Sequence, residues 1–273
     1  MKKFFTLFLE SVLLFASCAG IENIMQKTVV PAEDSQSQKT TDPSFEEMYD
    51  SNYWVTKPQG GAITVLGIAG RRSNREEAIT EALADAARKA ALYHGVRGES
   101  AAVLNQGSGN LDYFSDFDYR LYLLNDVENY ISDLVFDRNK DIVEKDGSVL
   151  VRVQYFGVSD IPVYETILGN GTPAWVSDYT ASVPGFLIAV GYSKNRGSLQ
   201  KTYQASYENA IVSLLPRLSS RVSNEVIDTE GGKITRNISI SSGVLENVMI
   251  LETWFDRKIN ALWTLVAAKQ KAP

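Results

Sequence analysis

The chain has almost no cysteine or histidine: its 273 residues contain one of each, Cys18 and His94. A single cysteine excludes an intramolecular disulfide and any zinc or redox pair built on two thiols. A single histidine leaves no histidine pair for a metal, and the segment that folds offers it no cysteine partner for nucleophilic catalysis. We therefore expect no metal, no cofactor and no enzymatic activity.

The chain also lacks an excess of basic charge, with 27 Lys and Arg against 33 Asp and Glu and a net charge of -6. That balance argues against a nucleic-acid partner, because such proteins neutralise phosphates. The charge is uneven: residues 1–18 carry +1, residues 19–170 carry -10 and residues 171–273 carry +3. This asymmetry favours head-to-tail contact, either within one chain or between chains.

The N-terminus has the layout of a secretory signal peptide. Lys2 and Lys3 are followed by an apolar run from Phe4 to Phe15, and two small residues then precede Cys18. The run is too short for a stable membrane span. Residues 1–17 are therefore expected to be removed.

The small pair before Cys18 resembles the lipobox of bacterial lipoproteins. Two features depart from that pattern, Glu10 inside the apolar run and Phe15 in place of the more usual leucine, and spirochaete lipoboxes are looser than the common form. The resemblance implies a diacylglycerol on the Cys18 thiol and palmitate in the mature protein. It also implies anchoring in the cell envelope, at the outer membrane facing the periplasm. The alternative is that Cys18 is a buried residue of an N-terminal helix.

A polar segment and two similar stretches follow. Residues 18–44 are rich in Ser, Thr, Gln and charge, which predicts a flexible tether after the lipidated cysteine. Beyond it, a strand-like run leads into Gly67 and another into Gly191, and each continues into a basic loop and a long helical pattern. Aligning the two glycines superimposes the helical stripes without a gap.

Local signals place the ends of these elements. Ser73 and Glu76 fit a capping box for the first helix, and His94 with Gly95 fit its end. Pro216 is expected to kink or interrupt the second helix. The turn "KDGS" and the stretch from Arg257 to Asn260 predict two hairpins. "WFDRK" echoes "VFDRN", and Trp54 and Trp175 recur ahead of each first strand. The region from 98 to 124 remains unassigned.

These signals predict an α+β fold made of two tandem β-α-β-β units, each a small antiparallel or mixed sheet packed on one long helix. The first domain is expected at residues 45–168 and the second at residues 169–273. "PAWV", "VGYSKN", the long helix and the closing hairpin, from Pro173 onward, resemble the LPP20-type lipoprotein family. That resemblance implies a small α+β domain in a Gram-negative or spirochaete envelope lipoprotein, and it carries over no catalytic residue.

Two groups of residues are candidates for binding. The loops before the two helices carry basic side chains that suit an anion or a glycan strand at a helix N-terminus, with solvated surface as the alternative: Arg71, Arg72, Arg75, Lys194 and Arg196. The stretch "LDYFSDFDYRLYLL" carries aromatics that suit either a partner surface or the core: Tyr113, Phe114, Phe117, Tyr119 and Tyr122.

The expected function is a non-catalytic envelope lipoprotein that acts as a structural or protein-interaction module at a bacterial membrane surface. Its partners are the membrane, through the lipid anchor, and other proteins or further copies of itself. The alternative is a binding module for peptidoglycan or another anionic envelope ligand.

Metabolic labelling with palmitate tests the lipid anchor. Wild-type protein is expected to incorporate the label and Cys18→Ser is expected to incorporate none, because the substitution removes the only thiol. Equal absence of label in both proteins would instead support a buried Cys18.

Overall fold

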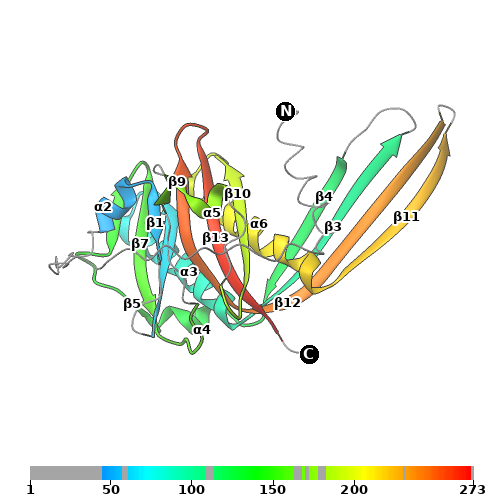
Figure 1. The fold of residues 1–273 in the computed structure, drawn as a ribbon. Coiled ribbons are helices and arrows are strands. Elements are labelled where there is room, and N and C mark those ends of the chain that lie inside the picture. The colour runs from blue at the N-terminus through cyan, green and yellow to red at the C-terminus, as the bar shows by residue number, and fades with distance from the viewer. Residues whose placement is uncertain are drawn as a thin grey trace, which may run out of the picture. The chain divides into compact units, whose positions relative to one another are not determined.

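The computed structural model describes residues 45–56, 61–107, 114–162, 168–169, 172–177, 183–229 and 232–271. They belong to one compact unit, Asp42–Pro273. Figure 1 shows how the helices and strands of these residues are arranged. The predicted signal peptide, Cys18 and the tether up to residue 44 lie outside the described residues, as does Tyr113.

The fold is α+β, as predicted from the sequence. The described helices are α2 (Phe45–Asp50), α3 (Arg75–His94), α4 (Glu128–Ile131), α5 (Ala174–Ser177) and α6 (Leu199–Leu218). The strands of the first part of the chain are β1 (Tyr53–Val55), β2 (Ile63–Gly70), β3 (Val96–Gly107), β4 (Phe114–Leu123), β5 (Leu134–Val135), β6 (Ile142–Lys145) and β7 (Ser148–Tyr155). Those of the second part are β8 (Leu168–Gly169), β9 (Thr172–Pro173), β10 (Leu187–Lys194), β11 (Ser220–Thr229), β12 (Gly232–Asp256) and β13 (Ala261–Gln270).

The sheets are antiparallel, and the largest one takes strands from both parts of the chain. Its order is β10-β13-β12-β3-β4, and β1 and β11 also pair with β12. A second sheet has the order β2-β7-β5, with β6 also paired to β7. The expected domain boundary near residue 168 therefore does not separate the sheets, because β3 and β4 precede it and are joined to β12, which follows it.

Each long helix packs closely on the strand before it, at a glycine. A Cβ added at Gly67 would overlap the backbone carbonyl of Ala82 in α3. A Cβ added at Gly191 would overlap the carbonyl of Ser206 in α6. Glycine is needed at both places because the helix backbone occupies the space that a side chain would fill.

Both predicted hairpins are present. Lys145 pairs with Ser148 across a turn in which Asp146 and Gly147 have φ of 51° and 73°, as a two-residue type I′ turn requires. The second hairpin joins Asp256 to Ala261. "VFDRN" begins at the last residue of β5 and continues into the segment before β6, whereas "WFDRK" begins within β12 and continues into the turn before β13.

Three sequence predictions concern the two ends of α3 and the continuity of α6. The N-cap of α3 is Asn74, whose side chain accepts from the Glu76 N–H, so the prediction of a cap at Ser73 was wrong by one residue. His94 is the last residue of α3 and Gly95 is its C-cap, as predicted. Pro216 does not interrupt α6, which continues to Leu218.

The glycine contact gives a stability prediction. Gly67→Ala is expected to lower the free energy of unfolding by roughly 2–3 kcal/mol, because α3 must move away from β2 to admit the methyl group. Gly70→Ala in the same strand is the matched control, since a Cβ there meets no atom within 4 Å. Chemical denaturation of both variants measures the difference, and equal stabilities would contradict the close packing.

Candidate interaction surface

Four strands run side by side in the order β11-β12-β3-β4, and we call their paired region the outer sheet (Figure 1). It comprises β11, β3, β4 and residues 232–245 of β12. The region of the sequence that remained unassigned, 98–124, supplies most of β3 and all of β4. In this sheet, residues that face each other across the strands lie on the same face.

One face of the outer sheet is covered by α6 only in part. Ser220, Ser241, Ser100 and Tyr119 form one row across the strands. The Tyr119 hydroxyl donates to the Glu208 carboxylate of α6 at 2.9 Å. Burial, together with the charge of Glu208, raises the pKa of Tyr119 to about 12. Ser241 and Ser100 in this row are buried and Tyr119 is half-buried, whereas Ser220 at its end is exposed.

The neighbouring row, farther from the core, is open to solvent. It consists of Val222, Ser239, Ala102 and Phe117, and its end members are 64% and 46% exposed. Val226, four residues farther along β11 and on the same face, is 61% exposed. On the opposite face Ile240 is 52% exposed. The outer sheet therefore presents apolar side chains to solvent on both of its faces.

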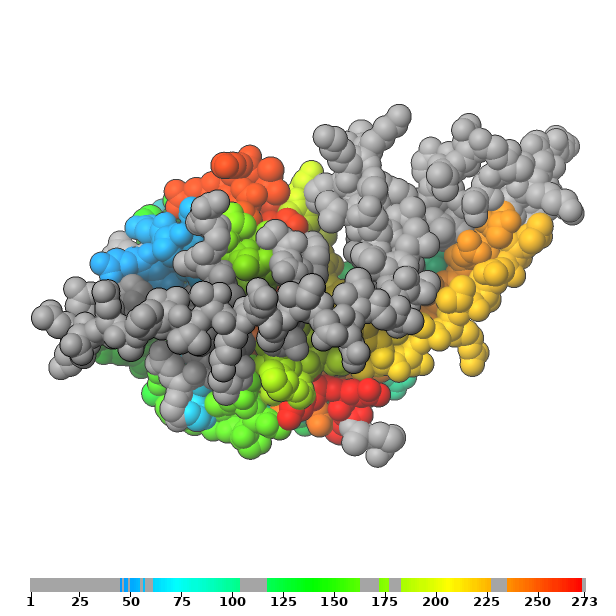
Figure 2. All heavy atoms as spheres, viewed as in Figure 1, coloured from blue at the N-terminus to red at the C-terminus, as the bar shows by residue number. Residues whose placement is uncertain are grey.

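The two border strands of the outer sheet pair on one side only within the described residues. β11 pairs with β12, and β4 pairs with β3. Every side chain of β11 from Ser220 to Val226 is exposed. Figure 2 shows β11 and β12, in yellow and orange, side by side on the molecular surface. A long border strand of this kind offers its backbone N–H and C=O groups to another strand.

The structure separates the aromatics that the sequence grouped together. Phe114 is the first residue of β4. Phe117 and Tyr119 lie on the same face with ring centroids 6.0 Å apart, yet Phe117 is exposed and Tyr119 is half-buried under α6. Phe117 is therefore available to a partner, whereas Tyr119 packs partly against the core, so each of the two predictions for this stretch applies to a different residue.

Most of the first basic loop is paired with carboxylates. Arg72 donates to Glu81 at 2.7 Å, and Arg75 forms an ion pair with Glu144. The hydrogen bond from Arg72 lowers the pKa of Glu81, which also interacts with Gln200 at the start of α6. These exposed ion pairs neutralise charge that an anionic ligand would need.

The remaining predicted basic residues, Arg71, Lys194 and Arg196, are exposed. The Arg71 N–H donates to the Gly147 carbonyl at 2.8 Å, and the Arg196 guanidinium donates to Ser193 at 3.3 Å. The structure thus positions both loops through hydrogen bonds within the chain.

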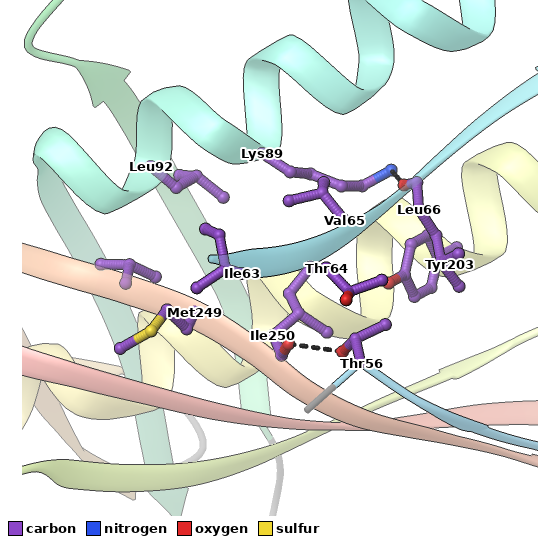
Figure 3. Close-up of a pocket in the computed structure, with 11 residues that line it drawn as sticks. Thr56, Ile63, Thr64, Val65, Leu66, Lys89, Leu92, Tyr203, Met249 and Ile250 are labelled. Atoms are coloured by element: carbon purple, nitrogen blue, oxygen red, sulfur yellow. Dashed lines mark hydrogen bonds between the residues drawn. The ribbon is translucent and has the colours of Figure 1, made fainter. Parts of the chain in front are cut away.

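An ion pair that the sequence analysis missed lies in the core. Lys89 and Asp85 of α3 are one turn apart, and their side chains are only 3% and 12% exposed. The Lys89 ammonium donates to the Leu66 carbonyl at 2.7 Å (Figure 3). Asp85 accepts from the Ile68 N–H at 2.8 Å. The pair therefore satisfies backbone groups on the side of β2 that faces away from β7. The signal available in the sequence was an i,i+4 acid–base pair beside the apolar stripe.

The surroundings of Lys89 indicate a structural role. Its ammonium lies 4.6 Å from the Tyr203 ring centroid and 5.7 Å from that of Tyr207, both in α6. Burial lowers the pKa of Lys89, and the charge of Asp85 opposes that effect. The adjoining cavity, lined among others by Thr56 and Val248, has a volume of about 10 Å³. That is about the room of one water molecule, too little for a substrate.

Two further polar groups are held by aromatic residues. Glu252 of β12 is fully buried and accepts from the Trp175 indole and the Tyr53 hydroxyl. His94 lies 2.6 Å from the Tyr155 hydroxyl and stacks on Tyr130 at 4.9 Å. Burial lowers the pKa of His94, so the imidazole is neutral at pH 7.

Trp175 connects α5 to β12, whereas Trp54 of β1 packs edge-on against Tyr203 of α6, so the two recurring tryptophans have different roles.

Neither metal chemistry nor a membrane-spanning helix is indicated within the described residues. No group of three or more His, Cys, Asp or Glu side chains there is placed to hold a metal. None of the helices described is both long and apolar enough to cross a bilayer. Comparison with protein families, curated proteins and solved structures found no match to this chain.

The buried ion pair gives a second stability prediction. Lys89→Met is expected to lower the free energy of unfolding by about 3 kcal/mol, because it leaves Asp85 without its cation and the Leu66 carbonyl without a donor. Arg72→Ala, which breaks an exposed ion pair, is the matched control and is expected to leave stability nearly unchanged. Urea denaturation compares the two. A Lys89→Met protein as stable as the Arg72→Ala protein would show that the buried pair is dispensable.

Proposed function

We propose that this protein is a non-catalytic lipoprotein of the bacterial envelope, held to a membrane through Cys18, that acts by binding proteins through its outer sheet. The anchor is supported by the N-terminal sequence and its resemblance to a lipobox. The interaction role is supported by the outer sheet. The location we propose is the outer membrane, with the folded part in the periplasm.

The observation that carries the interaction role is the exposure of the outer sheet on both faces and at both borders. Val222, Val226, Ile240 and Phe117 are each between 46% and 64% exposed. Natural proteins usually protect border strands with proline, charge, bulges or shortness. β11 carries charge at Arg221 and Glu225, but it runs for ten residues in regular register, without proline or a bulge. Such a strand is expected to be covered by a partner.

Binding of peptidoglycan or another anionic polymer is the alternative, and the loop geometry supports it less well. Arg72 and Arg75 already have carboxylate partners within the chain. A polymer ligand would have to displace them or rely on Arg71, Lys194 and Arg196.

We also propose that the chain contains two copies of one β-α-β-β unit. A constant shift carries the bounds of β2 and α3, 63–70 and 75–94, onto those of β10 and α6, 187–194 and 199–218. The same shift carries Gly67 and Ala82 onto Gly191 and Ser206, the two places where the helix backbone meets a glycine. A hairpin of the outer sheet then follows each helix, β3 with β4 and β11 with β12.

Site-specific photocrosslinking in intact cells tests the interaction role. A photoreactive residue at Phe117 or Val222 is expected to give adducts with protein, identified by mass spectrometry. The same probe at Phe156, which is 53% exposed outside the outer sheet, is the matched control and is expected to give far fewer. Absence of protein adducts at both outer-sheet positions would contradict the proposal. Retention on purified sacculi that falls on Arg71→Ala would favour the polymer-binding alternative.

A further inference from the structure

The charged residues of β11 are spaced so that two copies of the strand, running antiparallel, place opposite charges beside each other. In "SRVSNEV", residues 220–226, Arg221 and Glu225 stand at equal distances on either side of Ser223. We propose that β11 pairs antiparallel with β11 of a second copy of this chain, around a two-fold axis at Ser223. The inference rests on the proposed function, since it names the protein partner that the outer sheet binds.

The charges of the strand fit this register. In an antiparallel pair centred on Ser223, Arg221 of each copy faces Glu225 of the other, and both lie on one face of the joined sheet. Within its own chain Glu225 is 4.0 Å from Arg236 of β12, at the edge of ion-pair distance. A second copy therefore adds two symmetric ion pairs without breaking a close one.

The apolar residues of the strand lie on the other face. Val222 and Val226, the two most exposed large apolar side chains in the described part of the chain, alternate with Arg221 and Glu225 along β11. In the same register Val222 of one copy and Val226 of the other are diagonal neighbours on this face, each beside the backbone of the opposite strand. Pairing thus removes apolar surface from water while it satisfies the backbone groups of the free edge.

The opposite border fits a second copy less well. Its pairing with β3 contains a register shift, between Val103 and Leu104, whereas β11 pairs with β12 in regular register throughout. Pairing at β11 around a two-fold axis joins two copies and no more. Such two-fold dimers are the commonest soluble oligomers.

Charge reversal with rescue by mixing tests the proposal. The full lipidated chain in excess detergent is expected to sediment as a dimer. Arg221→Glu and Glu225→Arg should each raise the dimer dissociation constant at least tenfold, because each places like charges at both symmetric positions. An equimolar mixture of the two variants should again form dimers, since every Glu then faces an Arg. Rescue by mixing also shows that neither variant has simply misfolded.

Disulfide trapping gives an independent measurement. Ser223→Cys places two thiols opposite each other on the axis, so oxidation should yield a covalent dimer. Asp118→Cys on the border of β4 is the matched control and should not crosslink. A dimer trapped by Asp118→Cys but not by Ser223→Cys, or one insensitive to both charge reversals, overturns the β11 contact. If the photoprobe at Phe117 or Val222 still captures another protein, the proposed interaction function stands and only the self-pairing fails.

Discussion

The arrangement of this protein depends on the continuity of one strand. β12 runs for 25 residues and pairs with four others: β11 and β13 in succession, and β3 and β1. Its inner half lies in the core, where Leu251 and Glu252 are fully buried, and its outer half carries the outer sheet. Because the two halves share one backbone, the position of the exposed strands is fixed by the packing of the buried ones. A rigid support of this kind allows a surface to bind without first ordering itself.

A second constraint is the close packing of the two long helices on the sheets. It is possible only because Gly67 and Gly191 have no side chain. Close approach brings α3 near enough to β2 for Asp85 and Lys89 to reach the backbone of that strand. Within the described residues β2 pairs with a strand on one side only, and these side chains bond to backbone groups on its other side, whereas no such bonds are found there for the border of β11. The borders of β2 and β11 thus differ in how their backbone groups are satisfied. For this reason we assign a structural role to the Lys89–Asp85 pair and a binding role to β11.

Much of the local structure could be predicted from the sequence, because it is decided within a few residues. The turn at Asp146 and Gly147 and the end of α3 at Gly95 follow from local conformational preference. The outer sheet could not be predicted in the same way. Both of its faces meet solvent, so the alternation of polar and apolar residues that marks a strand is weak in 98–124. Gly243 lies inside β12 at a place where the Leu218 side chain of α6 occupies the space that a Cβ would fill. Such contacts between distant residues leave no periodic signal.

The pairing of β1 with β12 also has a consequence for the order of folding. Trp54 faces Thr253, and the Tyr53 hydroxyl reaches Glu252 across a separation of 199 residues. A chain that emerges from its N-terminus exposes residues 45–56 long before their partners exist. The pairing of β1 with β12 closes a loop of 199 residues, which costs chain entropy, and it can form only after residues 252–254 have been synthesised. The β1–β12 pairing therefore requires that the chain be synthesised at least as far as residue 254. A truncation before that residue would leave Tyr53–Val55 without the strand with which it pairs.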